Sequence, residues 1–185
     1  MARSRRGASP PTPADVIAAR RKAVSLRQCY LRLLGRVLCL AAVCWLLLSH
    51  VFLLMQARGN EMFPAIKDGD LVIAFRLGRD YAKNDVVVYT VGGERRIGRI
   101  IAQSGDVVML DESGTLLVNG GVQRGAIVYP SYAKEAIEYP YTVPPGRVFL
   151  LGDHRTQSVD SRDHGALSVR AVQAKVITIV RRRGI

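Results

Sequence analysis

The sequence predicts a mainly β protein in which an antiparallel β domain, partly closed into a barrel or sandwich, follows a single membrane-spanning helix. Two observations point to this class. Residues 37–55 form an almost unbroken apolar run, with Ser49 and His50 as its only polar members. After Arg58 the sequence consists of short apolar runs separated by Gly, Asp and Asn turns, a pattern typical of antiparallel strands.

Basic residues crowd the N-terminal side of the apolar run. Residues 1–12 are rich in Arg, Pro, Ser and Ala, a composition that predicts a disordered cytoplasmic tail. Thr12, Pro13 and Asp15 then favour a helix start, because Thr caps helices, Pro suits the first helical position and Asp complements the positive end of the helix dipole. We therefore expect a basic juxtamembrane helix over residues 13–36, lying along the cytoplasmic leaflet.

Residues 37–55 are long enough to cross a membrane. At ~1.5 Å per residue, a helix of this length reaches ~28 Å, about one hydrocarbon thickness. The cations before the run place the N-terminus in the cytoplasm and the domain of residues 58–185 outside it. We expect a retained single-pass anchor in the cell membrane, in contact with lipid. The alternative is a cleaved secretory signal, whose apolar core is normally shorter.

Charge and cysteine content narrow the function classes. The formal net charge is +12, and the excess of cations stands beside the membrane segment, which favours anionic lipid and membrane orientation over a nucleic-acid partner. Cys29, Cys39 and Cys44 all lie in or before the apolar run, so no disulfide can link parts of the outer domain. Their spacing matches no metal site. The sequence therefore predicts no metal and no other cofactor.

A series of candidate strands follows Arg58. Turn sequences such as Asp68-Gly69-Asp70 and Asn119-Gly120-Gly121 separate them. Their regular spacing favours antiparallel pairing, with partial closure limiting the exposed edges. Residues 122–140 interrupt this rhythm and are predicted to form a longer loop or small insertion. The candidate strands are residues 71–75, 86–90, 96–102, 107–110, 115–118, 141–143, 148–151 and 174–180.

The stretch from Gly152 to Gly165 is almost entirely polar and follows a buried-type strand. Acids, arginines, histidines and hydroxyls are too dense for an ordinary turn, and such groups can be buried only if each finds a partner. We expect a rigid, cross-linked loop in which Asp160 pairs with Arg162, while Ser158 and Asp153 face neighbouring backbone or a site. The alternative is a hydrophilic turn between strands.

This stretch resembles the last motif of bacterial type I signal peptidases, the S26 family, with the pattern G-D-N-R-x-x-S-x-D-S-R-x-x-G. His154 replaces the asparagine of the pattern. The resemblance extends over nearly the whole chain from about Val37 onward and implies the antiparallel β fold of that family. The matching residues are Gly152, Asp153, Arg155, Ser158, Asp160, Ser161, Arg162 and Gly165.

The resemblance also locates the two catalytic positions of the family, a serine and a lysine base. The serine belongs to the motif S-M-x-P, and here Met62 and Pro64 place Glu61 at that position. The lysine belongs to the motif K-R-V-I-G-x-P-G-D, whose tail matches residues 99–106 and places Gly98 at the lysine position. Losing a catalytic nucleophile or base costs ~10⁴-fold or more in rate. The resemblance therefore implies a degenerate member of the family without an intact dyad.

Other chemistry at the same place is less favoured. Arg99 stays protonated and is no base, and His154 and His164 are spaced unlike the ligands of a metal site. We expect Glu61 to accept hydrogen bonds from Ser158 or Arg99, with Asp153, Asp160 and Arg162 as further supporting residues of the site. Relatives bind an extended peptide along strand edges. The residues expected to form that groove are Met62, Phe63, Pro64, Ile66, Ile97 and Ile100.

Acidic and glycine replacements at the dyad resemble the signal-peptidase-like proteins that help sortase assemble pili on Gram-positive surfaces. This resemblance implies an inactive chaperone or accessory factor that holds a pilin-type protein, with sortase and pilin subunits as partners. Two alternatives stay open at this point. One is a working signal peptidase that cleaves secretory signal peptides by an atypical mechanism, and the other is a regulatory partner of an active signal peptidase.

Overall fold

The computed structural model describes residues 13–123 and 129–181, and for residues 14–26 it describes the helical backbone alone. The tail predicted for residues 1–12 lies outside the described residues, as do residues 124–128 of the predicted insertion. The chain divides into two units, Met1–Leu47 and Leu48–Ile185. Each unit is described by itself below.

A single helix, α1 (Pro13–Val51), contains both the basic segment and most of the apolar run. Its first residue is the predicted Pro13, whose fixed φ suits that position. The stretch Arg27–Val51 is long and apolar enough to cross a membrane. Its apolar side chains are exposed, with Trp45 and Leu40 at 74% and 70%, as a lipid-facing helix requires. The helix ends at Val51, so the prediction of a helix to Met55 was wrong by four residues.

The helix ends at Val51 because the residues that follow it form a strand. β1 (Phe52–Gln56) pairs antiparallel with β2 (Leu71–Phe75), with Leu53 opposite Ala74 and Met55 opposite Val72. Leu53 is 5% exposed and Leu54 is 61% exposed, which is the alternation of a strand with one face in the core. Apolarity alone does not separate helix from strand, and here pairing with β2 decides the conformation.

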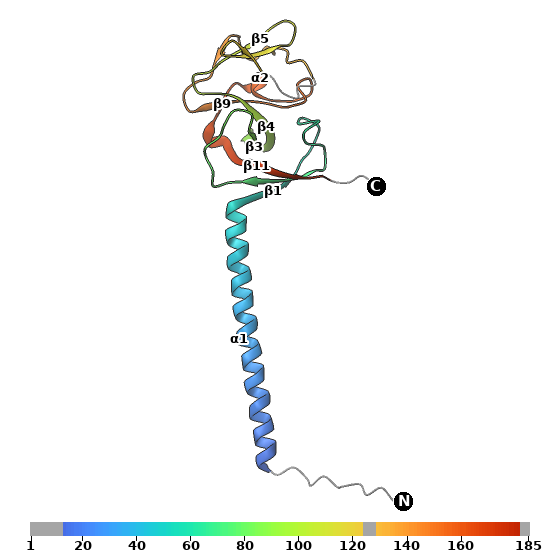
Figure 1. Ribbon diagram of the computed structural model, residues 1–185, viewed down its shortest axis with the longest axis vertical. Coiled ribbons are helices and arrows are strands. Elements are labelled where there is room, and N and C mark those ends of the chain that lie inside the picture. The colour runs from blue at the N-terminus through green and yellow to red at the C-terminus, as the bar shows by residue number, and fades with distance from the viewer. Residues whose placement is uncertain (1–12, 124–128, 182–185) are drawn as a thin grey trace, which may run out of the picture. The chain divides into compact units, whose positions relative to one another are not determined.

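The larger sheet has seven strands in the order β1-β2-β11-β3-β4-β9-β10, all antiparallel (Figure 1). The mainly antiparallel β class predicted from the sequence is therefore confirmed. β1 and the two-residue β10 were missed, since both owe their conformation to a partner strand. The remaining strands are β3 (Val86–Val91), β4 (Glu94–Gln103), β9 (Arg147–Leu151), β10 (Leu167–Ser168) and β11 (Val172–Val180).

A smaller, four-stranded sheet has the order β7-β6-β5-β8. Figure 1 shows β5 and β1 at opposite ends of the β domain, with the short helix α2 (Ser161–His164) between them. A 3₁₀ turn, η1 (Val169–Ala171), leads into β11. The predicted insertion begins in β7, so its first residue is in a strand. The strands of this sheet are β5 (Val107–Leu110), β6 (Leu116–Val118), β7 (Gly121–Val122) and β8 (Tyr141–Thr142).

Three clusters of buried apolar side chains hold the β domain together. One lies beneath β1, β2 and the segment that follows β1, and includes Leu53, Met62 and Ile66. A second joins the smaller sheet to β9 around Val108 and Phe149, and a third lies among β3, β4 and β9. The first cluster fixes the segment of residues 57–66 against the sheet, and this segment contains Glu61.

Candidate functional site

The polar stretch after β9 folds as a loop around the short helix α2. Asp160 is the N-cap: its carboxylate accepts the backbone N–H of Arg162, and the Asp163 carboxylate accepts the Asp160 N–H at 2.8 Å. This reciprocal capping satisfies donors that a helix start leaves unpaired. A four-residue helix has no stability of its own, so these caps and the surrounding contacts define it.

A buried ion pair stands at the centre of this loop. Arg162 Nη2 lies 2.9 Å from Asp160 Oδ2, and both side chains are at most 2% exposed. The Ser158 hydroxyl donates to the same oxygen at 2.6 Å, and the Gly152 N–H donates to it at 3.2 Å. The pairing expected for Asp160 with Arg162 is present. Ser158 is engaged as a donor within the loop and is not presented as a free nucleophile.

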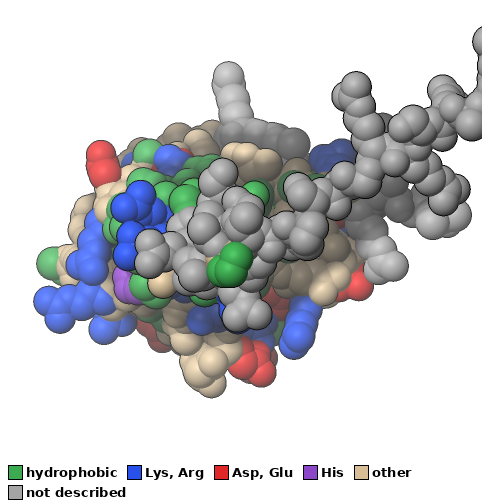
Figure 2. Space-filling model, turned by 90° about the horizontal axis from the view of Figure 1, so that it is seen from below, with side chains coloured by type: hydrophobic (Ala, Val, Ile, Leu, Met, Phe, Trp, Pro, Cys, Tyr) green, Lys and Arg blue, Asp and Glu red, His purple; other side chains and the backbone are tan. Residues whose placement is uncertain are grey.

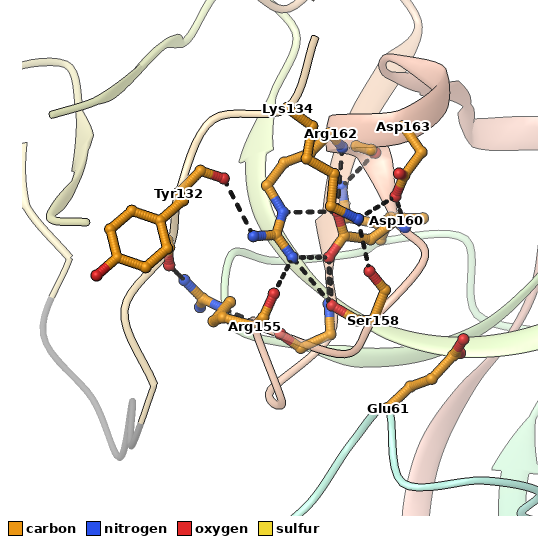
Figure 3. A network of polar contacts seen from close by, with 12 residues as sticks. Glu61, Tyr132, Lys134, Arg155, Ser158, Asp160, Arg162 and Asp163 are labelled. Atoms are coloured by element: carbon orange, nitrogen blue, oxygen red, sulfur yellow. Dashed lines mark hydrogen bonds and ion pairs between the residues drawn. The ribbon is translucent and has the colours of Figure 1, made fainter. Parts of the chain in front are cut away.

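The part of the predicted insertion that the structure describes closes over this loop (Figure 3). Ser131 accepts a hydrogen bond from Arg155, and the Tyr132 carbonyl accepts one from Arg162. Lys134 Nζ donates to the Ser158 carbonyl at 2.8 Å and to Asp163 at 2.6 Å. Burial lowers the pKa of the Arg155 guanidinium to about 10, so Arg155 is still charged at neutral pH. The loop is therefore rigid and cross-linked, as expected.

Glu61 lies outside this network, and no hydrogen bond or ion pair joins it to Ser158 (Figure 3). Its carboxylate accepts a hydrogen bond from Arg96 Nη1 at 2.7 Å, and both side chains are about one-quarter exposed. Arg96 also donates to Glu94 at 3.0 Å. The expectation that Ser158 or Arg99 would bind Glu61 was wrong. Alternate residues of a strand face the same side, so Arg96 shares a face of β4 with Gly98, whereas Arg99 points to the other face.

The space beside Gly98 is occupied by an aromatic ring. A Cβ atom at Gly98 would lie 3.0 Å from Tyr89 Cε1, closer than about nine in ten real Cβ contacts. Tyr89 lies on β3 directly opposite Arg96, diagonal to Gly98, and is 1% exposed. Burial raises the pKa of the Tyr89 phenol well above its usual range, and the charges of Asp160 and Glu61 raise it further. The phenol thus stays protonated and lies within electrostatic range of both carboxylates.

Arg99 is held on the opposite face by Asp153. Its Nε donates to Asp153 Oδ1 at 2.8 Å and its Nη2 to Oδ2 at 2.6 Å, a bidentate pair. Nη1 donates to the Asn84 carbonyl at 2.8 Å. The hydrogen bond to Asp153 raises the pKa of Arg99 above its ordinary value. Both residues therefore serve to tie β4 to the loop after β9.

The segment of Glu61 docks on the loop through main-chain contacts. The His154 N–H donates to the Glu61 carbonyl at 2.9 Å, and the His154 ring contacts the Asn60 carbonyl and stacks on Tyr129 at 4.2 Å between centroids. Only a glycine fits at position 152, where the segment of Glu61 meets the loop after β9. A Cβ atom there would lie 2.7 Å from the Glu61 carbonyl oxygen and 2.3 Å from Ser158 Cβ. This close approach explains the glycine that begins the motif.

A cavity of about 590 Å³ opens beside Glu61. It lies between the chain after β1 and the first residues of β4. Of the six residues predicted for a peptide groove, Met62, Ile66 and Ile97 line it. Phe63 and Pro64 lie outside its lining, and Ile100 is buried in the third core cluster, so its assignment to the groove was wrong. The lining residues that the prediction did not include are Met55, Gln56, Ala57, Arg58, Gly59, Glu94, Arg95 and Arg96.

The free edge of β4 borders the same cavity. Residues 94–98 pair with β3 on one side, while the pairing of β4 with β9 begins only at Arg99. Main-chain donors and acceptors along this short stretch are therefore available to an added strand. The described residues contain no group of His, Cys, Asp and Glu side chains arranged to hold a metal ion.

Comparison with known proteins agrees with this architecture. Residues 30–181 match the protein family described as signal peptidase, peptidase S26. The chain is 27% identical to signal peptidase I of Bacillus caldolyticus, over 73% of this chain and 84% of that protein. It is 33% identical to the probable thylakoidal processing peptidase 2 of Arabidopsis thaliana, over 61% of this chain and 34% of that protein.

The chain thus spans about a third of the length of the Arabidopsis relative and most of the length of the Bacillus one. A crystal structure of a signal peptidase I from Enterococcus faecalis is 26% identical, with a TM-score of 0.46, covering 54% of this chain and 97% of the other. The family match extends over far more than half of the sequence, through the segment of Glu61, β4 and the loop after β9. The protein belongs to the signal peptidase family, peptidase S26.

Proposed function

We propose that this protein is a membrane-anchored, catalytically inactive member of the family that binds an extended polypeptide. The observation that carries the proposal is the pairing of Glu61 with Arg96 beside a Gly98 covered by Tyr89. By resemblance these are the positions of the serine and the lysine. A carboxylate fixed by an arginine has no proton to lose, and a buried, protonated tyrosine accepts none.

Electrostatics also oppose acyl transfer at this site. A tetrahedral intermediate carries a negative charge that needs donors aimed at it. The Glu61 carboxylate places a negative charge there instead, and Arg96 is already engaged by Glu61 and Glu94. Ser158 is 3% exposed and bonded to Asp160, so it is no substitute nucleophile.

Peptide binding needs no nucleophile. The cavity beside Glu61 combines apolar lining from Met62, Ile66 and Ile97 with the unpaired edge of β4. An extended chain added at such an edge gains main-chain hydrogen bonds, while pockets select alternate side chains. We further propose that the bound chain is a pilin-type protein and that the role is that of a chaperone or accessory factor in sortase-dependent pilus assembly on the outer side of the cell membrane.

The second candidate is a signal peptidase with an atypical mechanism, favoured by the relatives, which are themselves named signal peptidases. To separate the two, the full chain in neutral detergent is incubated with a secretory preprotein, and the Bacillus caldolyticus signal peptidase I serves as the positive control. We expect an intact preprotein with this protein and a cleaved one with the control. Cleavage at the signal junction that Glu61→Gln abolishes would establish the atypical peptidase.

Binding is tested separately by photo-cross-linking. A photoreactive residue at the exposed position 94, on the free edge of β4, is expected to capture an extended peptide. The same residue at the exposed position 111, in the turn between β5 and β6, is the matched control and should capture little. Equal capture at both positions would remove the case for a groove along β4.

The proposed role in pilus assembly is tested by the presence of pilus polymers in cells. Deleting the gene should abolish pilus polymers, and the variant Glu61→Ala should restore them, since the proposed role needs no chemistry at that position. Normal pili in the deletion strain would refute the assembly role. Stable co-purification with an active signal peptidase from membranes would instead support a regulatory partner.

A further inference from the structure

A second cavity, of about 500 Å³, shares Arg95 with the cavity beside Glu61 and is lined by four arginines. Arg76 follows β2, Arg79 lies three residues later, Arg95 is in β4 and Arg170 is in η1. Sheet pairing brings them together: Arg95 is opposite Thr90 of β3, and the Thr90 hydroxyl accepts a hydrogen bond from Gln173 of β11 at 2.6 Å. The volume is in the ~300–1,000 Å³ range of small-ligand sites.

Among the described residues, these four arginines have no carboxylate partner, unlike several other arginines of the β domain. Arg96, Arg99 and Arg162 each form an ion pair. In the described part of the chain, none of the four cavity arginines does. The Arg76 Nε–H is buried and meets no acceptor among the described residues. Four like charges around one cavity repel each other, so the arrangement is complementary to an anion.

The polar residues of the cavity fit the same conclusion. Tyr81 also lines the cavity and is 7% exposed; burial raises the pKa of its phenol, while the charge of Arg79 opposes that shift. A neutral phenol and guanidinium groups are all hydrogen-bond donors. Planar guanidinium groups suit phosphate oxygens in particular, because they donate in pairs.

The place of the cavity along the chain identifies the source of the anion. Val51 is the last residue of the apolar span, and its carbonyl accepts the backbone N–H of Arg76 at 2.9 Å. Arg76 is therefore within hydrogen-bond distance of the point at which the span ends. The headgroup layer extends roughly 5–8 Å beyond the hydrocarbon on each side, so a residue at the end of the span lies at headgroup depth.

Exposed apolar side chains lie on β1, on β11 and in the segment that follows β2. Leu77 lies between Arg76 and Arg79 and is 65% exposed. Leu54 and Ile177, from β1 and β11, are also exposed, at 61% and 52%. Seen from below, the molecule shows Lys and Arg side chains with hydrophobic side chains among them and Asp and Glu side chains as well (Figure 2). Apolar side chains flanked by cations are typical of surfaces that enter the headgroup region.

We propose that Arg76, Arg79, Arg95 and Arg170 form a binding site for the phosphate of an anionic phospholipid, in the leaflet at the C-terminal end of α1. The site holds the β domain at the membrane surface, and of its four arginines only Arg95 also lines the cavity beside Glu61. Its source of affinity is the phosphate charge, so binding weakens as ionic strength rises.

The test measures lipid retained by the full chain in neutral detergent micelles, using native mass spectrometry during titration with phosphatidylglycerol or phosphatidylcholine. The wild type is expected to prefer phosphatidylglycerol. The variant Arg76→Gln/Arg79→Gln should lose roughly 10- to 30-fold in apparent affinity, at about 1 kcal/mol for each arginine. The matched control Lys67→Gln/Arg181→Gln removes two exposed cations outside the cavity and should retain the wild-type affinity.

Other results of the lipid titration would overturn the proposed phosphate site. Equal loss in both double variants would show general attraction by charge and overturn the site. Absence of a preference for phosphatidylglycerol would overturn it as well. Glycerol phosphate or inorganic phosphate that binds with the same dependence on Arg76 and Arg79, and without lipid, would assign the cavity to a soluble phosphate instead. Thermal unfolding without lipid shows whether each variant is folded, and Arg170→Gln provides a second variant from a different element.

Discussion

Gly98 and Tyr89 form a unit at the scale of single residues, because the ring of one fills the space that the other leaves. A glycine inside a strand lacks side-chain packing, and an aromatic ring from the neighbouring strand can supply it. Here the ring is fully buried, so it has little room to withdraw. Any side chain at position 98, lysine included, therefore has to displace Tyr89.

The variant Gly98→Ala tests this arrangement. The new Cβ atom would lie 3.0 Å from Tyr89 Cε1, and overpacking of a core costs about 1–3 kcal/mol, offset in part by the lower chain entropy of alanine. We expect a loss of about 1–2 kcal/mol in the free energy of unfolding, measured by urea denaturation. The control Gly121→Ala places its Cβ at an ordinary 3.5 Å from the Val118 carbonyl. Equal stability of both variants would show that Tyr89 moves freely.

Residue contacts differ in how far sequence alone predicts them. Asp160 and Arg162 are two positions apart in one polar stretch, so their pairing follows from local chemistry. Glu61 and Arg96 are far apart in sequence, and their contact depends on which face of β4 each residue occupies. Motif matching located Gly98 but not Tyr89, because the diagonal neighbour is known only once the register of β3 and β4 is known. A glycine within an apolar strand was the one available signal of close approach.

At the scale of elements, the loop after β9 owes its order to charged groups removed from water. Arg155 and Arg162 are both 1% exposed, and Asp160 neutralises Arg162 while capping α2. Removing one partner of a buried ion pair leaves an uncompensated charge. Lys134 and Ser131 add contacts from the preceding segment, so the loop and that segment form one polar core.

The variant Asp160→Ala should therefore destabilise the domain strongly. We expect a loss of about 3–5 kcal/mol in the free energy of unfolding, since Arg162 stays buried without its carboxylate. Urea denaturation of the full chain in neutral detergent measures it. The control Asp111→Ala removes an exposed carboxylate of a turn and should cost far less. A loss for Asp160→Ala no larger than that of the control would mean that water reaches Arg162.

The boundary between α1 and β1 is a second property of elements, and adjacent leucines test it. In a strand Leu53 faces the core and Leu54 does not, with exposures of 5% and 61%. Leu53→Ala should lower the free energy of unfolding by about 2–5 kcal/mol, and Leu54→Ala should change it by roughly 0.5 kcal/mol or less. The same urea experiment measures both. Similar effects of the two substitutions would favour a helix that continues past Val51.

This boundary also shows why part of the fold escaped prediction. Residues 52–55 continue the apolar run of the helix, and nothing local marks the change. The strand forms because β2 supplies main-chain partners and the first core cluster accepts Leu53. Short strands such as β7 and β10 were missed for the same reason. The longer strands β2, β3, β5 and β9 were located from their residues because turn signals bound them on both sides.

On the scale of the whole molecule, acid stability follows from carboxylates held by lysines. Burial alone would raise the pKa of Asp106 and of Asp163, but hydrogen bonds bring both pKa values below the ordinary one. The donors to Asp106 are the Gln103 N–H and Lys83. The donors to Asp163 are Lys134 and the Asp160 N–H. Lys83 joins the loop before β3 to the turn after β4, and Lys134 joins residues 129–134 to α2. Each pair thus links segments distant in sequence.

The sign of the pH dependence follows from these lowered values. A carboxyl whose pKa is lower in the folded protein binds fewer protons than in the unfolded chain, so its stabilisation is complete above the ordinary pKa of about 3.9 and is lost as pH falls through the folded value. We expect the free energy of unfolding to be steady above about pH 5 and to decline below about pH 4. The limiting slope is about 1.4 kcal/mol per pH unit for each proton taken up.

The variant Lys83→Met/Lys134→Met tests the origin of this decline. Without the two ammonium groups, the pKa values of Asp106 and Asp163 return toward the ordinary value, so the variant is less stable at neutral pH but loses less stability on acidification. Urea denaturation of the full chain between pH 3 and pH 7, followed by circular dichroism, gives both slopes. The control Lys67→Met removes an exposed lysine outside these pairs and should keep the wild-type slope. A double variant with that same slope would show that other carboxyl groups control acid unfolding.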